Sequence, residues 1–142
     1  MRDTRELVGT LAGAITAHDD DALVGCFHPD AVLVTPLGMV EGREQLGWYY
    51  RQLYTAFPDL RYEIRRCAVH EDGVVVEWTI SGTHLGPLTL PGGLEAEGSG
   101  RVVAWQGCSA YSVEEGAFVS GRIYYDQLAL YRQMGHGLTP AP

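Results

Sequence analysis

The sequence predicts an α+β fold in which N-terminal helices pack on one face of a curved antiparallel sheet. Apolar residues recur at helical spacing over roughly the first 58 residues and alternate with polar residues, as in strands, over most of the rest. Helices that precede a long meander of strands are typical of this class. The chain has 142 residues, 46% hydrophobic and 20% charged, without repeat or linker. We therefore expect one domain over 1–142, with its core at about 4–135 and a flexible tail at 136–142.

Two helices are expected before residue 28. Apolar side chains follow one helical face from Leu7 to Ile15, and Asp3 with Glu6 resembles a capping box ahead of them. The acidic run 19–21 predicts the start of a short second helix, because the positive end of a helix favours carboxylates. An acidic metal site is the alternative, but three adjacent residues at a helix end cannot all turn toward one ion.

A third helix follows a turn at 28–30 and a short strand at 31–35. Gly42 begins this helix, and the turn Phe57-Pro58-Asp59 ends it. Its apolar stripe consists of Leu46, Tyr50, Leu53 and Phe57.

Four long strands are expected in the remainder of the chain. Glycine-containing turns at 72–73 and 115–116 separate two pairs of them. The segment 86–93 is too rich in proline and glycine to continue a ladder, and we expect it to fold over the mouth of a pocket. The strands are predicted at about Arg61–His70, Val74–His84, Arg101–Val113 and Phe118–Leu128.

Composition excludes several classes of protein. Ten arginines against eighteen acidic residues give a net charge of -8, and the arginines form no run, which disfavours nucleic-acid and anionic-membrane partners. No apolar stretch has the length of a membrane span and the N-terminus lacks the order of a signal peptide, so we expect a cytoplasmic protein. The chain has no lysine, which excludes Schiff-base chemistry, a lysine-anchored pyridoxal cofactor and a phosphate-binding P-loop.

Motifs for metal binding and nucleophilic catalysis are missing. The three cysteines lack CxxC spacing and are expected to be reduced, and the five histidines show neither HxH nor HExxH spacing, so we expect no metal site. The segment 107–111 lacks the last glycine of a nucleophile elbow. Gly98-Ser99-Gly100 begins a dinucleotide-like pattern, but no helix is predicted after it.

One candidate acid/base group stands near the end of the last predicted strand. Tyr124 and Asp126 point to the same face of that strand. A bulged turn at 115–116 needs a positive φ only at its glycine, and the resulting register puts Gln106 on that face as well. If the helices cover this face, Tyr50 also lies nearby, and withdrawal from water would make Asp126 a stronger base. The alternative is a surface carboxylate at a strand end.

A second group of residues is expected to form the wall of a pocket. The segment 76–84 places five residues on one face of its strand, and their apolar character predicts the covered side. Trp78 should then line the cavity, with His84 at its rim. The alternative is that Trp78 is ordinary core and His84 is a solvated residue at the end of the strand.

The bulged turn also predicts an aromatic patch on the opposite face of the sheet. A solvated sheet face is normally polar, so an aromatic one is typical of an interface. We expect a homodimer joined through this outer face. The patch consists of Trp105, Tyr111, Val119, Ile123 and Tyr125.

Five short segments of the sequence share their order and spacing with a known family. They are Glu41-Gly42-Arg43-Glu44 leading into Ala56–Leu60, then Trp78–Gly86, then Gly121–Asp126 followed by Leu130–Gly135. Together they resemble the SnoaL-like polyketide cyclases of the NTF2-like superfamily. The resemblance implies a cone-shaped α+β domain, with a strongly curved sheet around a pocket that the N-terminal helices close.

The resemblance also implies a reaction. Cyclases of this family use an aspartate in the last strand as acid/base in an intramolecular aldol condensation, without cofactor or metal. Asp126 occupies that position here, and Tyr124 stands where the family has a histidine. We expect Tyr124 and Gln106 to orient the substrate.

These observations favour a cyclase of secondary metabolism that acts on a hydrophobic, polyketide-like small molecule. Because the chain has no lysine, an aldol reaction must proceed through an enolate rather than an iminium. The superfamily hosts other chemistries, so an isomerase, an epoxide hydrolase or a pericyclic cyclase is the alternative. A non-catalytic small-molecule-binding module is the alternative of another class.

Overall fold

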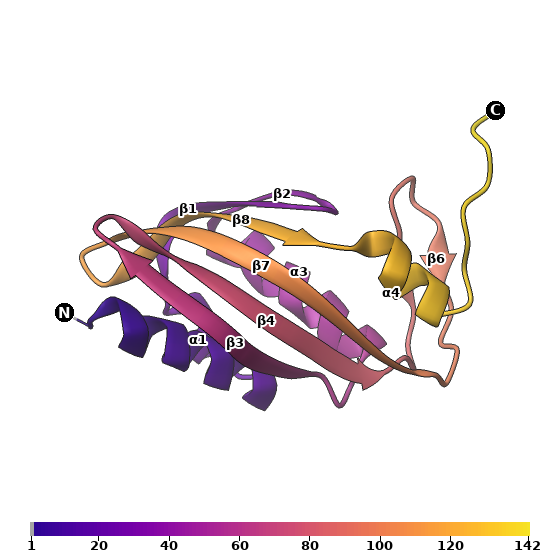
Figure 1. Cartoon of the computed structure of the whole chain (residues 1–142), viewed down its shortest axis with the longest axis horizontal. Coiled ribbons are helices and arrows are strands. Elements are labelled where there is room, and N and C mark those ends of the chain that lie inside the picture. The colour runs from indigo at the N-terminus through magenta and orange to yellow at the C-terminus, as the bar shows by residue number, and fades with distance from the viewer. Residues whose placement is uncertain (1) are drawn as a thin grey trace.

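The computed structural model, which describes residues 2–142, contains one six-stranded sheet and a separate two-stranded hairpin (Figure 1). The strands are β1 (Phe27–Thr35), β2 (Gly38–Glu41), β3 (Arg61–His70), β4 (Gly73–Thr83), β5 (Leu88–Thr89), β6 (Glu95–Ala96), β7 (Val102–Glu114) and β8 (Ala117–Tyr125). The large sheet has the order β2-β1-β8-β7-β4-β3, and only the pair of β1 and β8 is parallel. Mixed helices and a mainly antiparallel sheet confirm the predicted α+β class.

The helices α1 (Thr4–Ala17) and α3 (Gly42–Ala56) lie along one face of the sheet, as Figure 1 shows. Asp3 and Glu6 form the predicted capping box, and Asp19 caps the short helix α2 (Asp20–Val24). A fourth helix, α4 (Gln127–Gln133), follows the last strand. Across residues 2–142, every helix is too short or too polar to cross a membrane.

The turn between β7 and β8 differs from the prediction, although the register agrees with it. Glu115 and Gly116 both have positive φ, at 50° and 74°, so the chain turns in two residues without a bulge. The extra residue is Val119 on β8, at the register shift between the pairs Val113–Phe118 and Ser112–Ser120. As a result Cys108 pairs with Tyr124, as the bulged turn would also have required.

The helices cover the face opposite to the one we expected. Trp105, Tyr111 and Ile123 are buried between the sheet and the helices, with 3 to 6% of each side chain exposed. The face that carries Tyr124 and Asp126 is the solvent face. The physical reason is that one face of an antiparallel sheet is usually buried, and burying the aromatic face removes more apolar area from water than burying the face of Tyr124 would.

The last strand is shorter than predicted. β8 ends at Tyr125 rather than near residue 128, because the Asp126 side chain accepts a hydrogen bond from the N–H of Ala129 and begins α4. In this helix Gln127 and Tyr131 lie one turn apart and are joined by a hydrogen bond of 2.8 Å. Helix α4 therefore replaces the end of the predicted strand.

Candidate functional site

A small cavity lies in the centre of the fold, between the sheet and α3. Its volume is about 20 Å³, so aromatic side chains nearly fill the space. Tyr50 and Trp78, two of the predicted binding residues, both line it. The full lining is Tyr49, Tyr50, Leu53, Tyr62, Trp78, Ile80, Trp105, Ser109, Ile123 and Tyr125. We call this space the inner cavity.

Hydroxyl groups give the inner cavity its polarity. The indole N–H of Trp78 donates a hydrogen bond of 2.9 Å to Ser109 Oγ in the buried interior. The buried hydroxyl of Tyr62 has no hydrogen-bond partner among the described residues. A buried polar group without a partner lowers stability, and one at a cavity wall is available to a ligand.

The phenols around the inner cavity stay protonated far above neutral pH. Burial raises the pKa of Tyr49, and the neighbouring Tyr111 adds to the effect. Burial raises the pKa of Tyr50, which also lines the cavity, well above its ordinary value. Burial likewise raises the pKa of Tyr125. These side chains therefore act as neutral hydrogen-bond donors rather than as bases.

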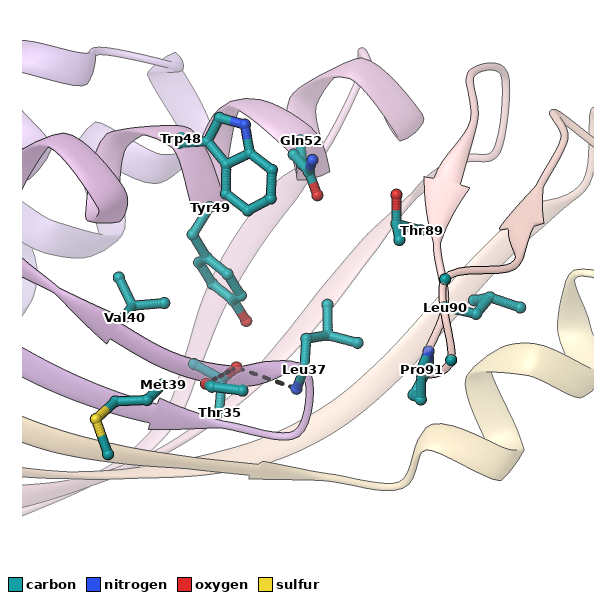
Figure 2. A pocket seen from close by; sticks show the side chains of 13 residues that line it. Thr35, Leu37, Met39, Val40, Trp48, Tyr49, Gln52, Thr89, Leu90 and Pro91 are labelled. Atoms are coloured by element: carbon teal, nitrogen blue, oxygen red, sulfur yellow. Dashed lines mark hydrogen bonds between the residues drawn. The ribbon is translucent and has the colours of Figure 1, made fainter.

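A larger pocket of about 310 Å³ opens beside α3 (Figure 2). We call it the outer pocket. Trp48 on α3 and Met39 on β2 are more than half exposed at its edge, which is unusual for large apolar side chains. The outer pocket is lined by Thr35, Leu37, Gly38, Met39, Val40, Trp48, Tyr49, Gln52, Thr89, Leu90, Pro91, Gly92 and Gly93.

The predicted loop forms one wall of the outer pocket. Thr89 to Gly93 belong to the hairpin of β5 and β6, and Figure 2 shows this segment facing α3 across the pocket. Gly92 and Gly93 have φ of 87° and 84°, a conformation that favours glycine. The expectation that segment 86–93 lies at the mouth of a pocket is confirmed for its second half.

Tyr49 lines both spaces. Among residues 2–142 it is the one residue shared by the two linings. Figure 2 shows its side chain reaching from α3 toward Thr35 and Leu37. Its ring packs edge-on against Tyr50, with ring centroids 5.1 Å apart and the planes at 90°. Tyr49 is thus the wall between the outer pocket and the inner cavity.

Sequence reasoning missed Tyr49, although the helical spacing could have identified it. Tyr49 follows Leu46 by three residues and precedes Leu53 by four, so all three share a helix face. The apolar stripe predicted for this helix included Tyr50 but not Tyr49. Both tyrosines are buried, so the covered part of α3 is wider than the one predicted stripe.

Three predicted residues lie on the solvent side of the sheet or at its end, outside these cavities. Asp126 is exposed and caps α4, and Tyr124 is 57% exposed on the solvent face of the sheet. Gln106 is exposed on the same face. The expectation that helices cover these side chains and withdraw Asp126 from water is wrong, because the sheet presents its other face to the helices. Their proposed chemical roles stay predictions.

His84 lies deeper than either expectation allowed. The residue is fully buried, not at a rim and not solvated. The N–H of Ser99 donates to its Nδ1 at 3.2 Å, so the ring carries its proton on Nε2, which has no partner among the described residues. Its ring packs against Phe57 at 5.5 Å, beyond the walls of both cavities.

The predicted outer patch is absent. Of its members, Trp105, Tyr111 and Ile123 are buried under the helices. These side chains are therefore not exposed to form the dimer interface that we predicted on the outer face of the sheet. Within residues 2–142 no three His, Cys, Asp or Glu side chains are grouped so that they could hold a metal ion.

The SnoaL-like domain family matches residues 8–121. This match covers most of the chain, including most of α1, all of α3, the whole lining of the outer pocket, and the lining of the inner cavity except Ile123 and Tyr125. This chain belongs to the SnoaL-like domain family. The match ends before Asp126 and α4, so the position of the expected acid/base residue in this SnoaL-like chain lies beyond the matched part. No curated protein matches the sequence.

Solved structures agree on the fold. A protein from Jannaschia sp. CCS1, provisionally named a SnoaL-like polyketide cyclase, is 24% identical with a TM-score of 0.81, covering 92% of this chain and 90% of that one. IdmH from Streptomyces antibioticus, provisionally named a polyketide cyclase, is 20% identical with a TM-score of 0.79, covering 95% and 100%. A Catenulispora acidiphila protein with a ketosteroid isomerase-like fold is 22% identical with a TM-score of 0.78, covering 97% and 100%. This SnoaL-like chain therefore has the ketosteroid isomerase-like, or NTF2-like, fold.

Proposed function

We propose that this SnoaL-like chain is a cyclase of secondary metabolism that closes a ring in a hydrophobic, polyketide-like molecule without a cofactor. The observation that carries the proposal is an apolar pocket of about 310 Å³ whose inner wall is the neutral phenol of Tyr49. Pockets for small ligands usually measure about 300–1,000 Å³ and combine apolar walls with few polar groups. The family membership and the provisional cyclase names of similar structures support the same reading.

The proposed reaction is an intramolecular aldol condensation. A base removes a proton from a methylene between two carbonyls of the substrate, and the resulting enolate carbon attacks a third carbonyl to form the new carbon–carbon bond. The alkoxide formed there takes up the proton. A neutral phenol such as Tyr49 donates a hydrogen bond to the enolate oxygen and stabilises its charge.

The base in this proposal is Asp126, as the family resemblance implies. Because its carboxylate is exposed and accepts the N–H of Ala129, the first turn of α4 must open before the carboxylate can reach the pocket. Tyr124 and Gln106 are exposed on the solvent face of the sheet, so their predicted role in orienting the substrate requires the same rearrangement.

A second candidate function needs no base. Within the described chain, neither carboxylate nor imidazole belongs to the lining of the outer pocket or the inner cavity. That lining suits a pericyclic ring closure, in which the protein folds the substrate and supplies only shape and hydrogen bonds. It also suits a module that binds a small molecule without converting it.

Turnover of two substrate sets tests the proposal. One set carries poly-β-keto chains and the other carries polyenes that close by pericyclic reaction, and products are identified by mass spectrometry and NMR. Cyclised poly-β-ketones, lost in an Asp126→Asn variant, support the aldol reaction. Ring closure of polyenes that is unaffected by Asp126→Asn supports the second candidate. Tight binding without any product from either set rejects both reactions in favour of the binding module.

A further inference from the structure

We infer that Tyr49 sets the length of the molecule this chain accepts by closing off the inner cavity, which would hold the carbonyl end of a longer, flat, fused-ring ligand if this side chain were smaller. The inference rests on the proposed function, since it requires that the outer pocket binds a hydrophobic molecule. It adds a residue that determines specificity, and it gives a chemical class for the far end of the longer ligand that this residue excludes.

The two spaces differ greatly in size and meet at one side chain. The outer pocket holds about 310 Å³ and the inner cavity about 20 Å³. A molecule that enters beside Trp48 and Met39 therefore meets the Tyr49 ring before it reaches the inner cavity. A small side chain at this position would join the two spaces. Tyr49 projects from the middle of α3, so this change leaves the backbone of the wall in place.

The position of the Tyr49 ring is well fixed. Only 7% of the residue is exposed, and its ring packs edge-on against Tyr50. Rotating the ring aside would break this contact and displace neighbours in a closely packed interior. The wall is thus a steric limit rather than a flap that any ligand pushes open.

The walls of the inner cavity suit flat rings. Trp78, Trp105 and Tyr125 surround it, with each indole centroid within 6.4 Å of the Tyr125 ring. Offset stacking and edge contacts with such walls favour planar aromatic molecules over bulky aliphatic ones.

The polar groups of the inner cavity select the end group. Tyr62 lines the cavity and its buried hydroxyl lacks a partner within residues 2–142. Burial raises the pKa of Tyr62, so the hydroxyl remains a donor. Neither Arg nor His belongs to the lining, so a carboxylate would be buried there without a counter-charge. A neutral carbonyl fits this donor best.

Binding of hydroxylated quinones with two, three and four fused rings tests the inference, measured by titration calorimetry. The variants are Tyr49→Ala, which removes the wall, and Tyr49→Phe, which keeps it. Met39 lines the outer pocket but not the inner cavity, and Leu53 lines the inner cavity but not the outer pocket, so Met39→Ala and Leu53→Ala are matched controls. Thermal unfolding checks that each variant is folded. If Tyr49→Ala does not fold, Tyr49→Leu takes its place.

We expect wild type and Tyr49→Phe to bind the two-ring quinone best and to lose at least tenfold in affinity for the four-ring quinone. Tyr49→Ala should reverse this order, and Met39→Ala and Leu53→Ala should not. An unchanged order in Tyr49→Ala, with wild type still binding the two-ring quinone, overturns the inference alone. Failure of every protein to bind any quinone overturns the proposed function together with it.

The end group is tested in the opened pocket. In the Tyr49→Ala background, Tyr62→Phe should weaken binding of the three-ring quinone by about threefold to tenfold. The same change should leave binding of a hydroxyanthracene, which has the same rings without quinone carbonyls, unaltered. An equal loss for both probes rejects the carbonyl subsite.

Discussion

The carboxylate of Asp126 accepts a hydrogen bond from the backbone N–H of Ala129 at 3.0 Å, and α4 begins at this bond. The same carboxylate occupies the position that the family resemblance assigns to the acid/base residue. Asp126 is therefore a candidate for two roles, one structural and one chemical. The roles can be separated, because Asn and Ser also cap helices but cannot take up a proton.

Substitution of Asp126 should separate stability from activity. We expect Asp126→Ala to lower the free energy of unfolding by about 1 kcal/mol through loss of the cap, and Asp126→Ser and Asp126→Asn to lower it by less. If Asp126 is the base, all three variants should lose about 10²-fold to 10⁴-fold in rate. Urea unfolding and steady-state kinetics measure the two effects. Full activity in Asp126→Asn would contradict the role as base and leave helix capping as the role of Asp126.

Ser109→Ala should destabilise the chain because it leaves the indole N–H of Trp78 without its hydrogen-bond acceptor. The variant removes the acceptor of the Trp78 indole N–H, which is buried and then has no partner. We expect a loss of about 1–3 kcal/mol in the free energy of unfolding. Ser109→Thr keeps the hydroxyl and serves as the control in the same urea titration. Equal stability of Ser109→Ala and wild type would mean that water replaces the hydroxyl.

Gly107→Ala should perturb the inner cavity from the sheet side. A methyl group at this position overlaps the Trp78 indole and lies 2.7 Å from the carbonyl oxygen of Tyr124. We expect a loss of about 1–3 kcal/mol, because a packed interior tolerates extra volume poorly. Tryptophan emission should shift as the ring moves. Gly9→Ala, on α1 with open space around the Cβ position, is the control and should not destabilise.

Asp59 should contribute a pH-dependent part of the stability. The backbone N–H and hydroxyl of Thr83 donate to its carboxylate at 2.6 and 2.8 Å, and these bonds hold the pKa of Asp59 below its ordinary value. A lowered carboxyl pKa stabilises the fold above the unfolded pKa of about 4, and the contribution is lost as the pH falls through the folded pKa. Asp59→Asn should therefore show a smaller drop in stability between pH 6 and pH 3 in urea titrations. A drop equal to that of wild type would contradict the assignment.

The tyrosines should ionise late in an ultraviolet titration. Burial raises the pKa of seven of the eight, including Tyr49 and Tyr50. Because the unfolded chain releases phenol protons near pH 10, the contribution of the tyrosines to stability should be constant below that pH and should be lost above it. Absorbance at 295 nm should rise mainly when the chain unfolds. Ionisation of most tyrosines near pH 10 in the folded state would contradict this picture.

Local patterns predicted most of the elements, but they did not predict which face of the sheet is buried. The bulged turn led us to predict Trp105 on the outer face of the sheet, whereas the apolar pattern of its strand led us to predict Trp78 on the covered face. In the structure Ile80 pairs with Trp105 across β4 and β7, and Trp78 lies on the Ile80 side, so both indoles must share a face. A long connection joins these strands, and no turn type fixes its register.

The candidate site was predictable only in part for the same reason. Tyr50 and Trp78 were identified because each follows from the periodicity of its own element. The interpretation of Asp126 depended on the choice of face, and the strand prediction overlooked that Asp126 and the helix formers after it resemble a helix start. The pairing of the outer pocket with the inner cavity depends on tertiary packing, which no local pattern encodes.

The inner cavity and the hydrophobic core are built from the same side chains. An altered residue there changes what the chain binds and how firmly it folds at once, so relatives that need a different ligand have little freedom at these positions. The segment Thr89–Gly93 stands apart from the main sheet, and Leu90 is its one member of the hydrophobic core. We expect substitutions that change ligand preference to arise first in the segment Thr89–Gly93, and we expect the aromatic residues of the inner cavity to change more slowly.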